Sequence, residues 1–214
     1  MKRLLLTCLL LSFVLAGCSG DSVANNMYNH LEKTIELEQP FVDGQAPFTA
    51  LEEQEQDLYD QIINLTADEM DEIQTLADEA ISTVAERKEL LQTEAEAMEE
   101  AEEEFDLVKR FTDDLDDESK SVAEDMVEAM DNRYEAYQQL NEAYLSSLEE
   151  DMTLYELFKD EDLTEEDLRE QTDQVNAAYD EVLSINTEFN EWTDTYNQLK
   201  QDFYDTTELN VVYE

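Results

Sequence analysis

The sequence predicts an all-α protein: an elongated antiparallel helical bundle of three long helices plus a short N-terminal helix, packed in a coiled-coil-like manner. Turn formers are scarce, because the 214 residues include only 3 glycines and 2 prolines, too few for the tight turns of a sandwich, barrel or propeller. Apolar residues recur at helical spacing over long segments. The apolar content of 42% is enough for a packed core despite the many acids.

The first 17 residues have the features of a lipoprotein signal peptide. Two basic residues follow the initiator Met, and residues 4–16 form an apolar run too short to span a bilayer. The run leads into residues 15–18, with the sequence LAGC, which is typical of a bacterial lipobox and places Gly17 directly before Cys18. We therefore expect cleavage between Gly17 and Cys18, with diacylglycerol, and in some cases an N-acyl chain, attached to Cys18.

This processing leaves the mature chain without a free thiol. Cys8 departs with the signal peptide and Cys18 becomes the lipid anchor, so no disulfide, cysteine nucleophile or cysteine metal ligand is expected. Residues 18–22 are predicted to form a lipidated tether, and residues 23–205 an elongated helical domain. Residues 206–214 show no clear period and are predicted to be an irregular C-terminal tail.

The short N-terminal helix is predicted from a narrow apolar stripe. Its residues recur every four positions: Val23, Met27, Leu31 and Ile35. We expect this helix to stop at Pro40. The stretch from Pro40 to Pro47 contains both prolines and Gly44, so it is predicted to be a loop through which the short helix folds back on the next one.

The first long segment covers residues 48–111. Its apolar stripe shifts by one residue near Thr66, where Thr66 and Glu69 have the spacing of a capping box. Unbroken, the 64-residue segment would be ~96 Å long. The pattern leaves open whether the segment is one helix or two.

Two further long helices are predicted after an acidic corner at residues 113–118. The first reaches about Lys159, with Ser121 as a candidate N-cap. The second begins at the capping pattern that starts with Thr164 and ends near Asp205. Short connections favour antiparallel neighbours, which suggests a slender bundle of the three long segments.

The charge excludes several classes of function. The chain has 58 acidic and 12 basic residues, a formal charge of −46 with His30 neutral, so it should repel nucleic acid. No glycine-rich loop could cradle a phosphate. His30 has no partner at a suitable spacing and is interpreted as a boundary residue. We therefore expect no catalytic residue and no cofactor, and we predict that the protein is not an enzyme.

Two acidic segments have carboxylates that could hold cations, and neither has the pattern of a metal centre. Residues 94–106 are interpreted as a solvated helix face, because Met98 and Phe105 continue the apolar stripe through them. Weak nonspecific binding of divalent cations to this face remains compatible with its charge.

The second acidic segment resembles a calcium loop only in part. Asp113, Asp117 and Glu124 stand at the first, fifth and twelfth positions. However, Leu115 replaces an oxygen ligand and Glu118 replaces the glycine of the sharp turn.

Aromatic residues offer a candidate glycan surface. Tyr134 lies off the predicted core stripe and Tyr204 lies near the end of the last helix, so these two are the candidate glycan contacts. The alternative interpretation places most of the rings in the core margin of a thin bundle, with the ring buried and the hydroxyl hydrated.

Several segments carry a resemblance to a known family. They are Tyr28–Lys33, Glu36–Phe41, Leu58–Ile63, Asn132–Tyr137, Tyr196–Lys200 and Phe203–Tyr204. Together with the lipobox, they resemble the YkyA family of Firmicute lipoproteins over nearly the whole mature chain. The resemblance implies a cell-wall-binding lipoprotein with no assigned reaction. The extreme acidity and few lysines depart from the family pattern and disfavour direct contact with anionic wall polymers.

The first hypothesis is therefore a non-enzymatic lipoprotein, held to the cell membrane by Cys18 on the extracytoplasmic side that faces the wall. Its partners would be the membrane and either peptidoglycan or another envelope protein. The alternative is a protein-interaction or chaperone-like helical module without wall affinity. A third class is an acidic reservoir of cations at the membrane.

Overall fold

Helices make up nearly all of the chain in the computed structural model, which describes residues 20–207 and 209. Between them, these residues contain helices and turns and no β-strand. The elements in chain order are α1 (Gly20–Leu37), α2 (Gln39–Ile62), η1 (Ala67–Glu69), α3 (Met70–Phe105), η2 (Val108–Arg110), η3 (Thr112–Asp114), α4 (Asp117–Phe158) and α5 (Glu165–Thr206). The predicted signal peptide and the sites at Gly17 and Cys18 lie outside the described residues.

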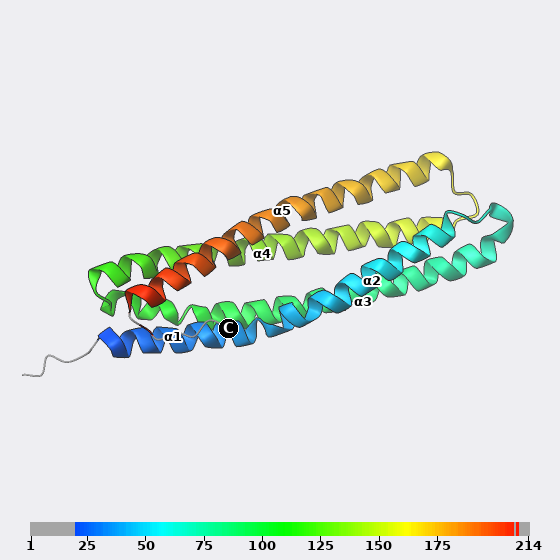
Figure 1. Ribbon diagram of the computed structural model, residues 1–214. Helices are drawn as coiled ribbons and strands as arrows, with labels where there is room; N and C mark the ends of the chain where they lie inside the picture. The colour runs from blue at the N-terminus through cyan, green and yellow to red at the C-terminus, as the bar shows by residue number, and fades with distance from the viewer. Residues whose placement is uncertain (1–19, 208, 210–214) are drawn as a thin grey trace, which may run out of the picture.

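The helices form a long rod of antiparallel arms (Figure 1). Helices α1 and α2 run end to end in one direction and pack on α3, which returns beside them. Helix α4 then runs back along α3, and α5 returns along α4. The predicted elongated antiparallel all-α bundle is confirmed. The predicted number of long arms is corrected, because α1 and α2 together make a fourth arm.

A break near Thr66 divides the segment that begins at residue 48. Helix α2 ends at Ile62, and η1 starts after Thr66, whose backbone N–H and hydroxyl both donate to the Glu69 carboxylate. These bonds satisfy groups that an uncapped helix start would leave exposed. The segment therefore forms two helices, α2 and α3. They are joined by a sharp reversal at the end of the rod away from the start of α1 (Figure 1).

The loop predicted between Pro40 and Pro47 is wrong. This stretch lies inside α2, with Pro40 in the first turn, where its missing N–H costs nothing. Pro47 lies inside the same helix, with its ring exposed. Gly44 is buried against α3, since a Cβ there would stand 2.9 Å from Oε1 of Glu94. The chain changes element at Glu38 instead, between α1 and α2.

The last two helices are each capped at their N-terminus by a side chain, and only the second cap is the predicted residue. Helix α4 is capped by Asp116, which accepts the backbone N–H groups of Glu118 and Ser119, so the prediction of Ser121 as its cap is wrong. Thr164 is the N-cap of helix α5, as predicted, and forms a capping box with Asp167. Both caps satisfy backbone donors in the first turn, where acids also complement the helix dipole.

Along α5 the core positions repeat every seven residues, which supports the coiled-coil-like packing. The buried members are Val182, Phe189, Tyr196 and Phe203. The same repeat continues back to Val175 and Leu168, but these two side chains are only partly buried. The N-terminal half of α5, which contains Leu168 and Val175, is therefore less buried than its C-terminal half.

A described residue beyond α5 packs against the bundle. Leu209 packs on the core and its backbone N–H donates to the Tyr204 carbonyl at 3.2 Å. Residue 206, placed in the predicted tail, is the last residue of α5. In residues 20–207 and 209, none of the helices combines the length and the apolar character needed to cross a bilayer.

Candidate functional site: a recess around Arg87

Two of the few arginines are buried in the bundle, each with its own set of polar partners. Arg87 of α3 is 2% exposed and Arg133 of α4 is 4% exposed. Arginine is rarely buried without a partner, so each position needs compensating groups. The partners of Arg133 close around it, whereas those of Arg87 line a cavity.

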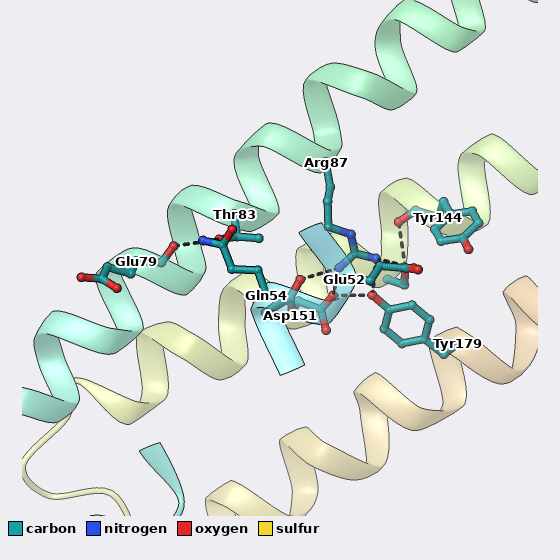
Figure 2. A network of polar contacts seen from close by, with 10 residues as sticks. Glu52, Gln54, Glu79, Thr83, Arg87, Tyr144, Asp151 and Tyr179 are labelled. Atoms are coloured by element: carbon teal, nitrogen blue, oxygen red, sulfur yellow. Dashed lines mark hydrogen bonds and ion pairs between the residues drawn. The ribbon is translucent and has the colours of Figure 1, made fainter. Parts of the chain in front are cut away.

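The Arg87 guanidinium reaches acids on two other helices (Figure 2). Its Nη1 donates to Oε2 of Glu55 at 2.5 Å and lies 3.5 Å from Oδ2 of Asp151. Its Nη2 donates to Oε1 of Glu52 at 3.2 Å. Helix α2 supplies both glutamates and α4 supplies the aspartate. One guanidinium therefore links three carboxylates across the bundle.

Helix α5 contributes a phenol to the same network. The hydroxyl of Tyr179 accepts from Nη2 of Arg87 at 2.9 Å and donates to Oδ2 of Asp151 at 2.6 Å. The guanidinium also lies 5.0 Å from the centroid of the Phe48 ring, within cation–π distance. Within the described chain, Nε of Arg87 has no hydrogen-bond acceptor. All four long arms thus meet at this arginine.

A cavity of about 370 Å³ opens beside these groups. We define the Arg87 recess by its charged and phenolic groups Glu52, Glu55, Arg87, Asp151 and Tyr179, its neutral polar residues Gln56, Thr172 and Asn176, and its apolar wall of Tyr59, Leu154, Tyr155 and Val175. The recess is lined by residues of α2, α4 and α5 together with Arg87 of α3. Helix α5 packs mainly on α4.

The environment of the recess raises the pKa of its acids. Burial, reinforced by the charge of Asp151, raises the pKa of Glu55 to about 7 despite the opposing effect of Arg87. Burial also raises the pKa of Glu52 and of Asp151. One guanidinium is therefore insufficient to hold three ionised carboxylates at their ordinary pKa.

This arrangement suits the binding of a polar group better than the binding of a metal ion. Buried carboxylates supply hydrogen-bond acceptors, and the tyrosines add hydroxyls and ring faces. Among residues 20–207 and 209, no group of three or more His, Cys, Asp or Glu side chains has the arrangement of a metal site. The chemistry available in the recess is thus hydrogen bonding and stabilisation of positive charge.

The two tyrosines proposed as glycan contacts are not surface residues. Tyr134 and Tyr204 are each 2% exposed. The hydroxyl of Tyr134 donates to Glu38 at 3.1 Å, and that of Tyr204 donates to Glu32 at 3.2 Å. Both rings fill the core next to α1, so neither has a free face for a sugar. The expectation of exposed rings at these positions is corrected.

His30 is a boundary residue, as the sequence predicts, but it has a distant partner. Its Nδ1 lies 2.6 Å from Oε1 of Glu104, and its ring stacks on Phe111 with centroids 5.6 Å apart. The side chain of His30 is 28% exposed. These contacts join α1 to the end of α3, which is a structural role.

The calcium-like corner does not form a twelve-residue loop. Helix α4 already begins at Asp117, and Glu124 lies within it. Asp113 accepts from Nζ of Lys120 at 2.6 Å. The first and twelfth positions of the apparent motif are therefore separated by a helix.

The acidic run at residues 94–106 is mostly a solvated face, with one exception. Met98 and Phe105 are buried as expected, and most of the acids are exposed. Glu94 is buried, and burial raises its pKa to about 7. It accepts from Nε2 of Gln45 at 3.3 Å. This carboxyl is thus a buried charge with one neutral donor.

Sequence reasoning missed the residues of the Arg87 recess. One signal was present: Arg87 stands between Val84 and Leu91 on the apolar stripe of α3, in a chain with only 12 basic residues. A basic residue at a core position requires buried acids nearby. The sequence could not identify Glu52, Glu55 or Asp151 among 58 acids.

Comparisons with known proteins agree with this architecture. Residues 22–206 match the model of the YkyA family, described as "Putative cell-wall binding lipoprotein". The chain is 35% identical over 196 residues to the "Uncharacterized lipoprotein YkyA" of Bacillus subtilis (strain 168), which covers 91% of this chain and 88% of that protein.

A solved structure is similar in fold. It is the crystal structure of a conserved protein of unknown function from Staphylococcus aureus, with a TM-score of 0.75. The alignment covers 86% of this chain and 93% of that chain at 14% identity, so the likeness concerns the fold alone. The family model and the relative from Bacillus subtilis both extend over most of the protein, and the chain therefore belongs to the YkyA family of lipoproteins.

Proposed function

We propose that this protein is a non-enzymatic, lipid-anchored envelope protein that binds peptidoglycan through the Arg87 recess. Membership of a lipoprotein family implies a membrane-anchored, extracytoplasmic location. The observation that carries the proposal is the recess itself, where three carboxylates and a tyrosine from three helices surround one buried arginine beside a cavity. Concave sites with a few converging polar groups are the usual places for ligands.

The position of the recess along the rod favours contact with the wall. Helix α1 begins at Gly20, directly after the predicted lipidation site, and the recess begins at Glu52. At the rise of an α-helix, these two positions are roughly 50 Å apart along the first arm. A ligand site at this distance from the anchor can reach material that does not touch the membrane surface.

The net charge determines which wall components are suitable. A chain with a formal charge of −46 repels polyanions such as teichoic acids. Peptidoglycan presents sugars, peptides and amino groups with less negative charge, so it faces a smaller electrostatic barrier. The proposal therefore concerns peptidoglycan and not the anionic polymers of the wall.

Sedimentation with purified sacculi tests the proposal. Residues 19–214, which contain all described helices, are mixed with sacculi with and without teichoic acid, and with and without calcium. We expect sedimentation with bare sacculi in the absence of calcium. We also expect Glu52→Gln to weaken it and Glu53→Gln to leave it unchanged, because Glu53 is an exposed acid on the same helix.

Absence of sedimentation in every condition would contradict wall binding. Cross-linking in intact cells would then identify the protein partner that the interaction-module hypothesis requires. Equal loss of binding in both glutamine variants would show that general charge, and not the recess, controls the contact.

A further inference from the structure

We propose that the Arg87 recess binds a protonated primary amine, such as a free amino group on a wall peptide. The inference rests on the proposed function for the source of the amine, and it adds the chemical class that the recess recognises. The balance of charge, the count of hydrogen-bond donors and the apolar wall of the cavity support it independently.

The charges of the recess are unbalanced toward the negative. Glu52, Glu55 and Asp151 face a single guanidinium, that of Arg87, which leaves a formal excess of two negative charges when all are ionised. Glu55 and Asp151 are almost fully buried, so water screens them poorly. A ligand with one positive charge reduces this excess, whereas an anion increases it.

The carboxylates of the recess also have unused acceptor positions. Each ionised carboxylate can accept about four hydrogen bonds. Within the recess, Asp151 accepts from the Tyr179 hydroxyl at 2.6 Å and has only a long, 3.5 Å contact with Arg87. Glu52 accepts from Arg87 at 3.2 Å. An ammonium group brings three donors and no acceptor, which matches these free acceptor positions.

The wall of the cavity suits the carbon chain that carries such an amine. Tyr59, Leu154 and Val175 line the recess together with the acids, and Tyr59 and Leu154 lie one helical turn from Glu55 and Asp151. A volume of about 370 Å³ admits a lysine-sized side chain together with water. Long amines bury their methylene groups along apolar surface while the charged end meets polar groups.

Other ligand classes fit the recess less well. A neutral sugar would hydrogen-bond to the acids but would leave the excess charge buried. A divalent metal ion requires converging ligands, and the described residues contain no group of three His, Cys, Asp or Glu with that geometry. A protonated amine satisfies both the charge and the acceptors.

The ionisation of Glu55 provides an additional readout. Burial raises its pKa to about 7, and a bound cation favours the ionised carboxylate. Affinity should therefore fall as the pH drops from 8 to 6, because Glu55 then takes up a proton. The charged and titratable groups that act on it directly are Arg87, Asp151 and Tyr155, and Glu52 and Tyr179 bind the same guanidinium.

Isothermal titration calorimetry with a matched pair of probes tests the inference. The first probe is Nα-acetyl-lysine amide, which carries one free ammonium group. The second is Nα,Nε-diacetyl-lysine amide, which has the same stem without the charge. We expect heat of binding with the first probe and at least roughly tenfold weaker binding with the second, because a charge-assisted contact is lost.

Two glutamine variants locate the binding. Glu52→Gln removes one recess charge, and its side chain is 38% exposed, so the fold should persist. We expect it to weaken binding of the first probe by roughly tenfold. Glu53→Gln removes the same charge from an exposed neighbour and should change the affinity less than twofold. Equal affinity for both probes, equal effects of both variants, or no binding of either probe would overturn the inference.

Acetylated sacculi separate this inference from the proposed function. Acetic anhydride removes free amino groups from the wall and leaves the glycan strands in place. If untreated sacculi bind and acetylated sacculi do not, both proposals are supported. If both preparations bind, the amine inference is overturned and wall binding stands. If the amine probe binds and neither preparation does, wall binding is overturned and the amine specificity of the recess stands.

Discussion

Arg87 and Arg133 are both buried in this acidic rod, but their surroundings differ. Arg133 forms a two-point pair with Glu38, at 2.6 and 2.9 Å, and its Nε donates to Thr193 at 3.0 Å. Every guanidinium nitrogen there has an acceptor. Arg87 faces three carboxylates beside a cavity, and its Nε has no acceptor within the described chain.

The difference teaches that burial of an arginine does not by itself indicate a binding site. One guanidinium against one carboxylate is a balanced pair, and in this protein it holds the junction of α1 and α2 against α4 and α5. One guanidinium against three carboxylates is unbalanced, and it is associated with open space. The balance of charge and the accessible volume distinguish a structural cluster from a candidate site.

The largest expected effect is on stability, from Arg133→Met. The substitution leaves the Glu38 carboxylate without its cation, with only the Tyr134 hydroxyl still donating to it, and removes a cation from the face of Phe189, 5.0 Å away. We expect a loss of about 3–5 kcal/mol in the free energy of unfolding, measured by urea denaturation followed by circular dichroism. A double variant with Glu38→Met should recover most of the loss, and an equally unstable double variant would contradict the assignment of a balanced pair.

Arg87→Met should cost less and depend more on pH. At pH 8 we expect a loss of roughly 2–3 kcal/mol, because three acids remain without a cation but can draw in water or take up protons. Arg87 opposes the burial that raises the pKa of Glu55, so without Arg87 the native state binds protons more readily than the native parent protein does. The cost should therefore shrink between pH 8 and pH 5.5. A cost that does not change with pH would mean that Arg87, like Arg133, belongs to a balanced structural ion pair.

Glu94 sharpens the comparison, because it is a buried charge with no cation. Its pKa is raised to about 7 by burial, so native-state stability falls as the pH rises from the ordinary pKa of glutamate to about 7, because the unfolded chain loses this proton first. Glu94→Gln should stabilise the protein by roughly 1–2 kcal/mol at pH 8 and by clearly less near pH 5. Thermal unfolding at both pH values measures this. The exposed Glu96→Gln is the control and should not show the pH-dependent gain.

The smallest effect on stability is expected from Glu52→Gln. The glutamine keeps an oxygen that can accept from Nη2 of Arg87, and the side chain is 38% exposed. The free energy of unfolding should change by no more than about 0.5 kcal/mol. The variant should nevertheless weaken amine binding. A large loss of stability, measured by the same denaturation assay, would mean that the recess is a structural cluster.

Much of the fold was predictable because it depends on local patterns. The heptad positions from Val182 to Phe203 and the capping boxes at Thr66 and Thr164 could be read from short stretches of sequence. The segment from Pro40 to Pro47 was misread, because a proline in the first turn and an exposed one further along are both compatible with a helix whose neighbours hold it in place.

The candidate site was much less predictable. The sequence predicts Tyr134 and Tyr204 at the surface, but both are buried in the core. The relevant acids, Glu52, Glu55 and Asp151, are far apart in the sequence and look like any other acid on a helix face. Their importance comes from Arg87 on a third helix.

The sequence by itself determined the helical rod, its acidity and its membership of a lipoprotein family. Apolar spacing, turn chemistry and charge act locally or sum over the whole chain, so they can be read without knowing which helices touch. Only the tertiary structure decided which arginine is balanced and where the bundle stays open. Those properties depend on burial and on the distance between charges from separate helices, and both arise when the helices pack together.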